Sequence, residues 1–257
     1  MARSEGAGLK RKHVLVAGAL VLVLALAAGA YARIDNDWRS ASRARVGLAP
    51  DPAVTAEAVV QVYAARTVGV RGLFGVHSWV AVKPANAPAY TVYEVIGWKL
   101  RSDDTAVSVR ERDPDARWFG NPPELLAQAR GAQAQALIPK IEAAVRSYPY
   151  ADEYRAWPGP NSNTFTAWIA RKVPELRVDL PSTAVGKDYL TGGLFASAPS
   201  GSGYQLSLVG LLGVTVSTVE GLEVNILGLT FGIDPWPPAL KLPIAGRLGA
   251  ARAPSGA

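Results

Sequence analysis

Two runs near the middle of the chain decide the fold class: Val76–Lys83 (VHSWVAVK) and residues 91–98 (TVYEVIGW). Both are rich in β-branched and aromatic residues, which favour strands. Residues 84–88 (PANAP) lie between them and favour a turn. The pattern predicts a β-hairpin, and a turn centred on Asn86 and Ala87 would set Trp79 opposite Glu94.

The predicted hairpin brings chemically useful side chains onto one face. Because side chains alternate along a strand, His77, Trp79 and Glu94 share a face, with Glu94 diagonal to His77. A carboxylate in that position can orient the imidazole and raise its basicity. A slip of one residue in register would move Glu94 to the other face. The simpler interpretation is that His77 is a half-buried strand residue with a satisfied ring.

Other segments complete a mixed α+β pattern. Residues 55–65 fit a helix or a strand, and Val107–Glu111 fits a third strand. A helix is predicted from Asn121-Pro122-Pro123-Glu124 through LLAQARGAQAQAL, with Pro139 kinking it or opening a second helix. A further helix is predicted over residues 163–172.

The C-terminal part is apolar and glycine-rich. Residues 204–218 and 222–233 are β-like and are predicted as the two arms of one hairpin, joined at Glu220 and Gly221. Its broad apolar surface is expected to be core, although it could lie against a membrane or a partner. The expected fold is an antiparallel sheet packed against helices, which the hairpin extends or covers.

Composition excludes several kinds of chemistry. The 257 residues contain no cysteine, which excludes disulfides, thiolate metal sites and a cysteine nucleophile. The formal charge is +6, but residues 1–32 contribute half of it, and the rest of the chain carries 23 basic and 20 acidic residues. No nucleic-acid partner is therefore expected. No cofactor is expected either, because phosphate-binding glycine loops and clusters of metal-binding histidines are absent from the sequence.

Residues 14–32 (VLVAGALVLVLALAAGAYA) form an uncharged stretch of 19 residues that follows Lys10-Arg11-Lys12. This length and flank predict a transmembrane helix with a cytoplasmic N-terminus and a body outside the cytoplasm. A cleaved signal peptide is the alternative, since Ala30-Tyr31-Ala32 is a suitable exit site. The expected order is a basic tail (1–13), the membrane segment (14–32), a linker (33–54), one domain (55–245, with the hairpin at 204–233) and a disordered tail (246–257).

The start of the helix predicted at residues 163–172 is the second candidate site. Asn161, Ser162, Asn163 and Thr164 are all residues that cap helices, and capping is one complete explanation for them. The functional explanation places the Ser162 hydroxyl at the positive end of the helix dipole, where backbone amides can hold an oxyanion. A serine there needs a base, and His77 is the only imidazole outside the N-terminal tail.

The residues quoted so far resemble a known bacterial family. The string RTVGVRGLFGVHSWVAVK, together with YEVIGW, GPNSNTFTAWIARKVPEL and DLP, resembles the family catalogued as domain of unknown function 3750. The resemblance covers roughly residues 55–190 and is expected to include the C-terminal hairpin. It implies a bacterial protein without an established activity, and the apolar segment at residues 14–32 adds the expectation that it is an envelope protein with its body outside the inner membrane.

A shorter resemblance suggests a mechanism. In circularly permuted papain-like proteins, such as the lecithin–retinol acyltransferase-like group, a strand histidine precedes an Asn-Cys-x-x-Phe helix start. Asn161-Ser162-Asn163-Thr164-Phe165 is similar to that start, with serine in place of the cysteine. The resemblance implies a cleft with His77, Ser162 and Glu94 as catalytic residues. Asn161, Asn163, Trp79 and Tyr93 would then be its binding residues.

Two functions follow from these patterns. The first is a membrane-anchored envelope protein that binds a ligand or partner, through a degenerate papain-like cleft or through the apolar C-terminal hairpin. The alternative is a serine-dependent hydrolase or acyltransferase that acts on amide or ester bonds in the envelope. Peptidoglycan peptides and lipids are the expected ligand classes in either case.

Overall fold

The computed structural model describes residues 38–256. The predicted membrane segment at residues 14–32 lies outside the described residues. Within residues 38–256, no helix is both long and apolar enough to cross a membrane. Residues from Arg39 onward form one compact unit.

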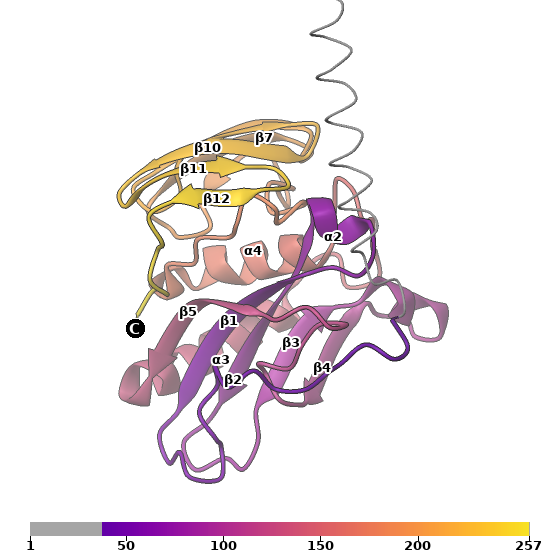
Figure 1. The fold of residues 1–257 in the computed structure, drawn as a ribbon, viewed down its shortest axis with the longest axis vertical. Helices are drawn as coiled ribbons and strands as arrows, with labels where there is room; N and C mark the ends of the chain where they lie inside the picture. The colour runs from indigo at the N-terminus through magenta and orange to yellow at the C-terminus, as the bar shows by residue number, and fades with distance from the viewer. Residues whose placement is uncertain (1–37, 257) are drawn as a thin grey trace, which may run out of the picture. The chain divides into compact units, whose positions relative to one another are not determined.

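The first sheet has five antiparallel strands in the order β4-β3-β2-β1-β5 (Figure 1). Its strands are β1 (Val59–Arg66), β2 (Val76–Lys83), β3 (Thr91–Val95), β4 (Val107–Glu111) and β5 (Glu124–Arg130). The short helix α2 (Arg71–Phe74) joins β1 to β2, and the 3-10 helix η1 (Gly97–Arg101) follows β3. Val80 pairs with Tyr93 and Val82 with Thr91, so the predicted hairpin and its register are confirmed.

The segment after Asn121 differs from its prediction. Residues 124–130 were expected to be helical, but they form the edge strand β5, which pairs with β1. The helix α3 (Gly131–Arg146) begins only at Gly131, where φ is +59°, and it runs through Pro139. Pairing with β1 outweighs the helix propensity of LLAQAR, since tertiary contacts override weak local preferences. The same pairing makes the ambiguous segment 55–65 a strand from Val59 onward.

Two helices cover one face of the five-stranded sheet. The helices α3 and α4 (Ser162–Lys172) pack on it, and the 3-10 helix η2 (Pro174–Leu176) follows α4. The core on this side contains fully buried Val80, Ile141 and Phe165. The opposite face has its own buried cluster, which includes Tyr63, Trp79 and Trp118. Both faces are covered, which is why every residue of β2 is buried.

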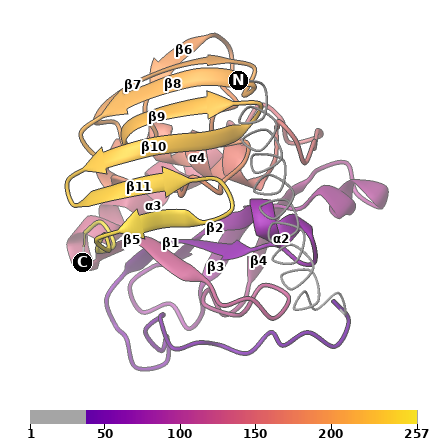
Figure 2. The same cartoon turned by 45° about the horizontal axis from the view of Figure 1, so that its top comes forward.

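The second sheet is a seven-stranded antiparallel meander (Figure 2). Its strands are β6 (Phe195–Ser197), β7 (Gly203–Leu208), β8 (Leu212–Ser217), β9 (Gly221–Ile226), β10 (Leu229–Pro235), β11 (Pro238–Leu242) and β12 (Gly246–Gly249). The prediction of one hairpin over 204–233 was wrong because each apolar run folds back on itself. The internal turns lie at Gly210 and Gly228, whose φ angles are +72° and +77°. The predicted disordered tail at 246–257 likewise contains β12.

The helix α4 lies between the two sheets (Figures 1 and 2). It packs on β2 and β3 on one side, and its Arg171 donates to the Ser197 carbonyl and to Gln205 on the other. The described part of the chain is therefore an α+β fold of two antiparallel sheets with helices between them, which confirms the expected class.

Candidate functional site

His77 and Glu94 meet as the hairpin register predicts. The His77 Nε2 and Glu94 Oε2 atoms lie 2.8 Å apart, and both side chains are buried. Because an ionised carboxylate can only accept, His77 donates this hydrogen bond. Two arginines complete the cluster: Arg110 Nη2 lies 2.9 Å from Glu94 Oε1, and Arg112 Nη2 lies 3.4 Å from Glu94 Oε2.

The cluster fixes the charge of both groups. Burial alone would raise the pKa of Glu94, but its interaction with His77, the charge of Arg112 and the hydrogen bond from Arg110 lower it to about 2. Burial lowers the pKa of His77 below its usual value, and the two arginines oppose the raising effect of Glu94. At neutral pH the pair is therefore a neutral imidazole hydrogen-bonded to a carboxylate.

Aromatic rings enclose this imidazole. The His77 ring stacks on Trp118 with centroids 3.8 Å apart, and the Trp79 ring lies 5.6 Å from the His77 ring and 6.1 Å from the Trp118 ring. Trp98 continues the stack beyond Trp118, at 6.0 Å. The predicted binding residues Trp79 and Tyr93 lie on opposite faces of the sheet, because Tyr93 packs on the helix side.

The polar start of α4 is a helix cap tied to the sheet. The Asn161 Oδ1 atom accepts from the backbone nitrogens of Asn163 (2.9 Å) and Thr164 (3.2 Å), which forms a capping box. Asn163 Nδ2 donates to the Val76 carbonyl at 3.0 Å. Ser78 Oγ donates to Asn163 Oδ1 at 2.8 Å. Asn161 thus caps α4, and Asn163 holds the start of α4 against β2.

The structure does not bring the predicted base and nucleophile together. Ser78 points toward α4, so its neighbour His77 points to the opposite face of the sheet, where it contacts Glu94 and Trp118. Ser162 starts α4 on the Ser78 side and is buried. In the described part of the chain, the His77 ring has Glu94 as its polar partner and makes no hydrogen bond to Ser162.

The seven-stranded sheet carries a different kind of surface. In β7 the apolar residues are exposed and the polar residues are buried: Tyr204, Leu206 and Leu208 are exposed, while Gln205 and Ser207 between them are buried. The pattern continues across the sheet, so that apolar residues point outward and polar residues point toward α4. We call the apolar side the outer face. Its exposed members are Phe195, Tyr204, Leu206, Leu208, Leu212, Val214, Val216, Leu222, Ile226, Phe231, Ile233, Leu240 and Leu248.

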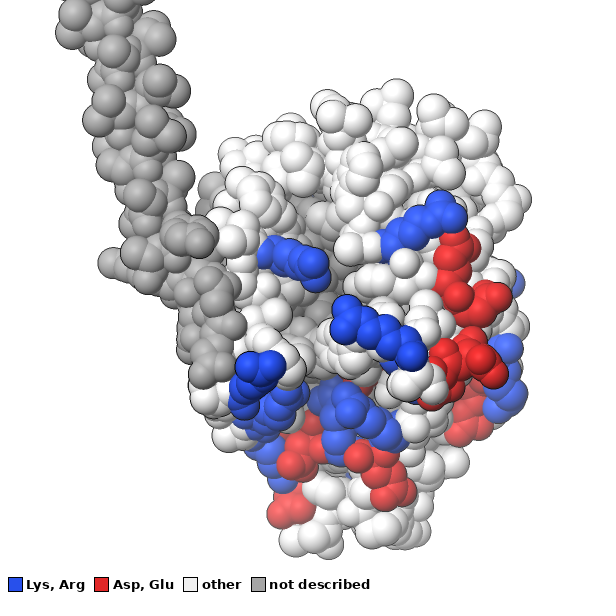
Figure 3. All heavy atoms as spheres, turned by 90° about the vertical axis from the view of Figure 1, so that its right-hand side faces the viewer, with Lys and Arg blue, Asp and Glu red and all other residues white. Residues whose placement is uncertain are grey.

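Cross-strand pairing makes the outer face continuous. Leu206 pairs with Phe195 and Val214. In a second row, Ile233 pairs with both Leu222 and Leu240. All outward positions of β6 to β12 carry uncharged residues. In Figure 3 the uppermost part of the described surface, which belongs to this sheet in Figure 1, contains no charged residue, and Lys and Arg side chains lie below it.

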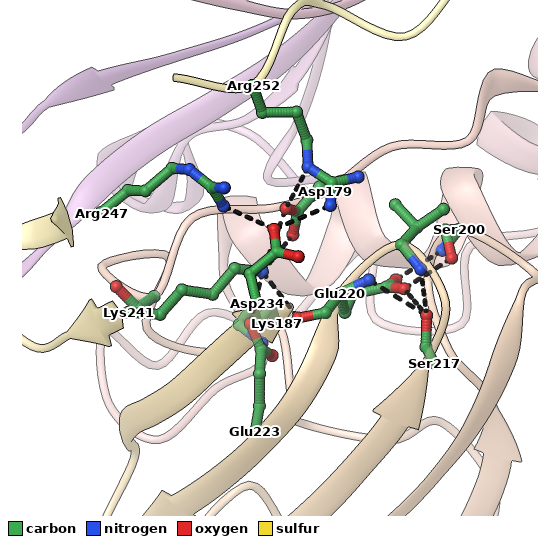
Figure 4. Close-up of polar contacts among 12 residues, drawn as sticks. Asp179, Lys187, Ser200, Ser217, Glu220, Glu223, Asp234, Lys241, Arg247 and Arg252 are labelled. Atoms are coloured by element: carbon green, nitrogen blue, oxygen red, sulfur yellow. Dashed lines mark hydrogen bonds and ion pairs between the residues drawn. The ribbon is translucent and has the colours of Figure 1, made fainter. Parts of the chain in front are cut away.

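The inner side of the same sheet holds a buried ionic network (Figure 4). Lys241 Nζ lies 2.7 Å from Asp179 Oδ1 and 2.9 Å from Glu223 Oε1, and Glu223 also binds Lys187. Burial opposes the charge of both lysines, but the neighbouring carboxylates raise the pKa of Lys187 and of Lys241. The network is therefore charged, and each ion has a partner.

Further polar groups complete this interior. Asp188 accepts from Asn225 Nδ2 at 2.6 Å and from Thr230 Oγ1 at 3.0 Å. Asp234 accepts from Arg247 at 2.6 Å and from Arg252 at 2.7 Å. Hydrogen bonds and ion pairs thus replace an apolar core on this side of the sheet.

A cavity of about 440 Å³ opens beside this network, between β1, β5 and the β11–β12 edge. The cations that line it already have partners. Arg66 donates to the carbonyls of Gly72, Leu73 and Ile244, and Lys241 is held by Asp179. We assign no ligand to it.

Sequence reasoning missed the direction in which the outer face points. The signal was present in the strict alternation of residues 204–208, where Gln205 and Ser207 interrupt the apolar series. The alternation defines an apolar side, but it carries no information on whether that side meets the core or the outside.

Comparisons with known proteins bear on the first part of the chain. The model of a family described as a protein of unknown function (DUF3750) matches residues 57–189, which is more than half of the chain. The comparisons with curated proteins and with solved structures found no match. The family match ends before β6, so the seven-stranded sheet lies outside it, and the match does not extend to the C-terminal strands as expected. The chain belongs to the DUF3750 family.

Proposed function

We propose that this protein is a non-catalytic binding protein of the bacterial cell envelope that lies on the membrane surface through its outer face. One observation carries the proposal: the seven-stranded sheet buries its polar side chains and exposes its apolar ones. A one-sided antiparallel sheet in water has the reverse arrangement. The exposed side therefore fits an apolar neighbour better than water.

The size of the outer face supports an occupant that covers all of it. It extends over strands β6 to β12, whereas soluble monomers rarely expose more than a few hundred Å² of contiguous apolar surface. Burial of such a surface gains about 25 cal/mol per Å². Contact with an apolar phase would offset the cost of the buried ions beneath the sheet.

A lipid bilayer fits this surface better than a folded protein does. Protein interfaces usually combine an apolar centre with side-chain hydrogen bonds, and the outward positions of β6 to β12 supply few. Two tryptophans stand at opposite ends of the sheet: Trp157 beside the β9–β10 turn and Trp236 in the β10–β11 turn. Tryptophan is favoured at the boundary between lipid and water.

The expected tether at residues 14–32 supports the same proposal. A segment that enters the inner membrane would keep the rest of the chain near the bilayer outside the cytoplasm. Linked contacts gain from this high local concentration, so a weakly binding face would be occupied most of the time.

The serine-dependent alternative has less support. Acyl transfer by Ser162 needs a base within hydrogen-bond reach, whereas the His77 ring faces the other side of the sheet. A papain-like cleft would need the same two residues to face each other. We therefore propose the outer face as the binding surface, with lipid as the ligand class.

The proposal can be tested with single cysteines, because the natural chain has none. Val216→Cys on β8 and Val109→Cys on β4 form a matched pair, since the native side chains are 59% and 56% exposed. Each full-length variant is labelled with an environment-sensitive fluorophore and reconstituted at low density into vesicles of phosphatidylethanolamine and phosphatidylglycerol. We expect a blue-shifted emission, quenched by spin-labelled lipid, at position 216 and water-like emission at position 109.

If something other than lipid covers the outer face, the fluorescence of these two variants differs from this expectation. A blue shift at position 216 that spin-labelled lipid does not quench would mean that protein covers the face, and the membrane proposal would fail. A dependence on protein density would identify a second copy, whereas independence would identify residues of the same chain. Water-like emission at both positions would exclude any occupant.

A further inference from the structure

We infer that one edge of the seven-stranded sheet inserts into the acyl region of the bilayer through three apolar turn tips, Val209, Leu227 and Ile244. We call this edge the insertion edge. The inference rests on the proposed membrane-surface function and adds a direction and a depth to it. All three residues have a positive φ, which is unfavourable for branched apolar side chains.

Topology places the three tips together. In an antiparallel meander, alternate turns lie at the same edge, and the turns β7–β8, β9–β10 and β11–β12 contain Val209, Leu227 and Ile244. A hydrogen bond from Leu227 N to the Leu211 carbonyl, 2.5 Å, joins two of these turns directly. All three side chains are exposed.

Each tip has a backbone conformation that is unfavourable for its residue type. The φ angles are +48° at Val209, +53° at Leu227 and +67° at Ile244. Glycine, asparagine and aspartate are preferred at such positions, and branched apolar residues are rare there. Ile244 lies within a γ-turn closed by Ala245 N and the Pro243 carbonyl, which is itself a strained form.

The same chain uses a favourable residue elsewhere. The β2–β3 turn of the five-stranded sheet has Asn86 at φ +59°, also exposed, where asparagine fits the conformation well. The tips at the insertion edge thus combine strain with exposure of apolar side chains to water. Strained positions of this kind concentrate at functional sites.

The opposite edge of the sheet has a different composition. Its β8–β9 turn contains Val219 and Glu220, both buried, and Glu220 accepts from Ser200 Oγ at 2.5 Å. Its β6–β7 connection is rich in serine. Trp236 is the main apolar side chain exposed there. The asymmetry favours deeper insertion of the edge that carries the three tips.

The surroundings of the insertion edge suit a lipid boundary. Trp157 Nε1 donates to the Leu227 carbonyl at 2.9 Å, which places an indole ring next to that tip. Arg66 Nη2 donates to the Ile244 carbonyl at 2.7 Å. The same Arg66 side chain also donates to two backbone carbonyls of α2, whose Phe74 is exposed. A tryptophan and an arginine beside apolar tips match the order of acyl chain, interface and phosphate in a bilayer.

Depth measurements test the inference on the full chain. Val209→Cys, Leu227→Cys and Ile244→Cys are labelled and reconstituted like Val216→Cys, with Asn86→Cys as the control for an exposed turn of the same φ. We expect spin labels deep in the acyl chain to quench the three tips at least twofold more than headgroup spin labels do. Neither lipid is expected to quench position 86.

The outcomes separate this inference from the proposed function. If position 216 contacts lipid while the three tips stay in water, the insertion edge is wrong and the membrane-surface function stands. If position 216 and the tips all stay in water, both are wrong.

A second experiment uses the strain itself. Replacing the tips by asparagine (V209N, L227N, I244N) should raise Tm by about 2 to 4 °C per substitution, because asparagine suits the positive φ. The same triple variant should lose at least half of the lipid quenching at a labelled Val216→Cys. The matched variant Asn86→Val should lower Tm and leave that quenching unchanged. A fall in Tm in the triple variant, or unchanged quenching, would overturn the inference.

Discussion

The two sheets are both antiparallel, yet they bury opposite kinds of side chain. Every residue of β2 in the five-stranded sheet is buried, and five of its eight residues are valine, alanine or tryptophan. In β7 of the seven-stranded sheet, glutamine and serine are buried, while leucine and tyrosine are exposed. The contrast shows that an apolar face of a strand indicates an apolar neighbour, and that this neighbour need not be the core of the same protein.

The two regions are therefore held by different forces. Removal of apolar area from water stabilises the five-stranded sheet and its helices. Ion pairs and hydrogen bonds around Lys241 and Glu223 hold the seven-stranded sheet to Asp179 and Asp188, which lie in the segment after α4. Such buried ions add little net stability, but the loss of one partner leaves another charge unpaired.

The largest expected effect compares one residue type in the two regions. Phe165→Ala empties a fully buried site between α4 and the five-stranded sheet and should lower the free energy of unfolding by about 4 kcal/mol. Phe231→Ala on the outer face, where the ring is 41% exposed, should cost less than about 1 kcal/mol in detergent-free solution. Urea unfolding followed by tryptophan fluorescence measures both. Equal losses of unfolding free energy would mean that the outer face is packed like a core, and the two sheets would then be stabilised in the same way.

A somewhat smaller effect tests the ionic interior. Lys241→Met leaves Asp179 and Glu223 buried without that cation and should cost about 3 kcal/mol of unfolding free energy. Lys140→Met removes an exposed ion pair with Glu175 and should cost less than about 1 kcal/mol. If chemical denaturation finds the two variants equally stable, the network beneath the seven-stranded sheet does not hold it in place.

The smallest effect is a pH dependence that originates in the five-stranded sheet. The pKa of Glu94 in the folded protein is about 2, below its usual value of 4.5. The ionised Glu94 therefore stabilises the folded state above pH 4.5, and this stabilisation is lost as the pH falls toward 2. The expected loss is about 2 to 3 kcal/mol. The lowered pKa of His77 acts in the same direction below pH 6.5, because the unfolded chain then binds a proton that the folded chain does not.

Unfolding curves at a series of pH values check this sign. Glu94→Gln should flatten the acid limb between pH 4.5 and 2 while lowering stability at neutral pH. Stability that rises on acidification through this range would show that the arginines do not hold Glu94 ionised.

Local rules were enough for part of the candidate site. The turn at Asn86 fixed the register of β2 and β3, and that register put His77 beside Glu94. The capping residues at 161–164 predicted where α4 begins, because side-chain oxygens that satisfy free amides act over only three residues. Both features depend on neighbours in sequence or across one turn.

Features that depend on distant partners could not be predicted. The segment LLAQAR reads as helix until β1 is available for pairing. The separation of His77 from Ser162 depends on which face of β2 receives α4, and the two residues are 85 positions apart in the chain. Strand alternation defines two faces, but it does not choose which one a helix covers.

Short-range patterns in the sequence were sufficient for the hairpin of β2 and β3, the cap of α4 and the alternation that gives the second sheet one apolar and one polar side. These follow from steric and hydrogen-bonding preferences of short segments. The tertiary structure alone decided that Lys187, Lys241 and Glu223 meet beneath that sheet and turn its apolar side outward. The reason is physical: buried charges need partners, and those partners come from loops and strands far apart in the chain.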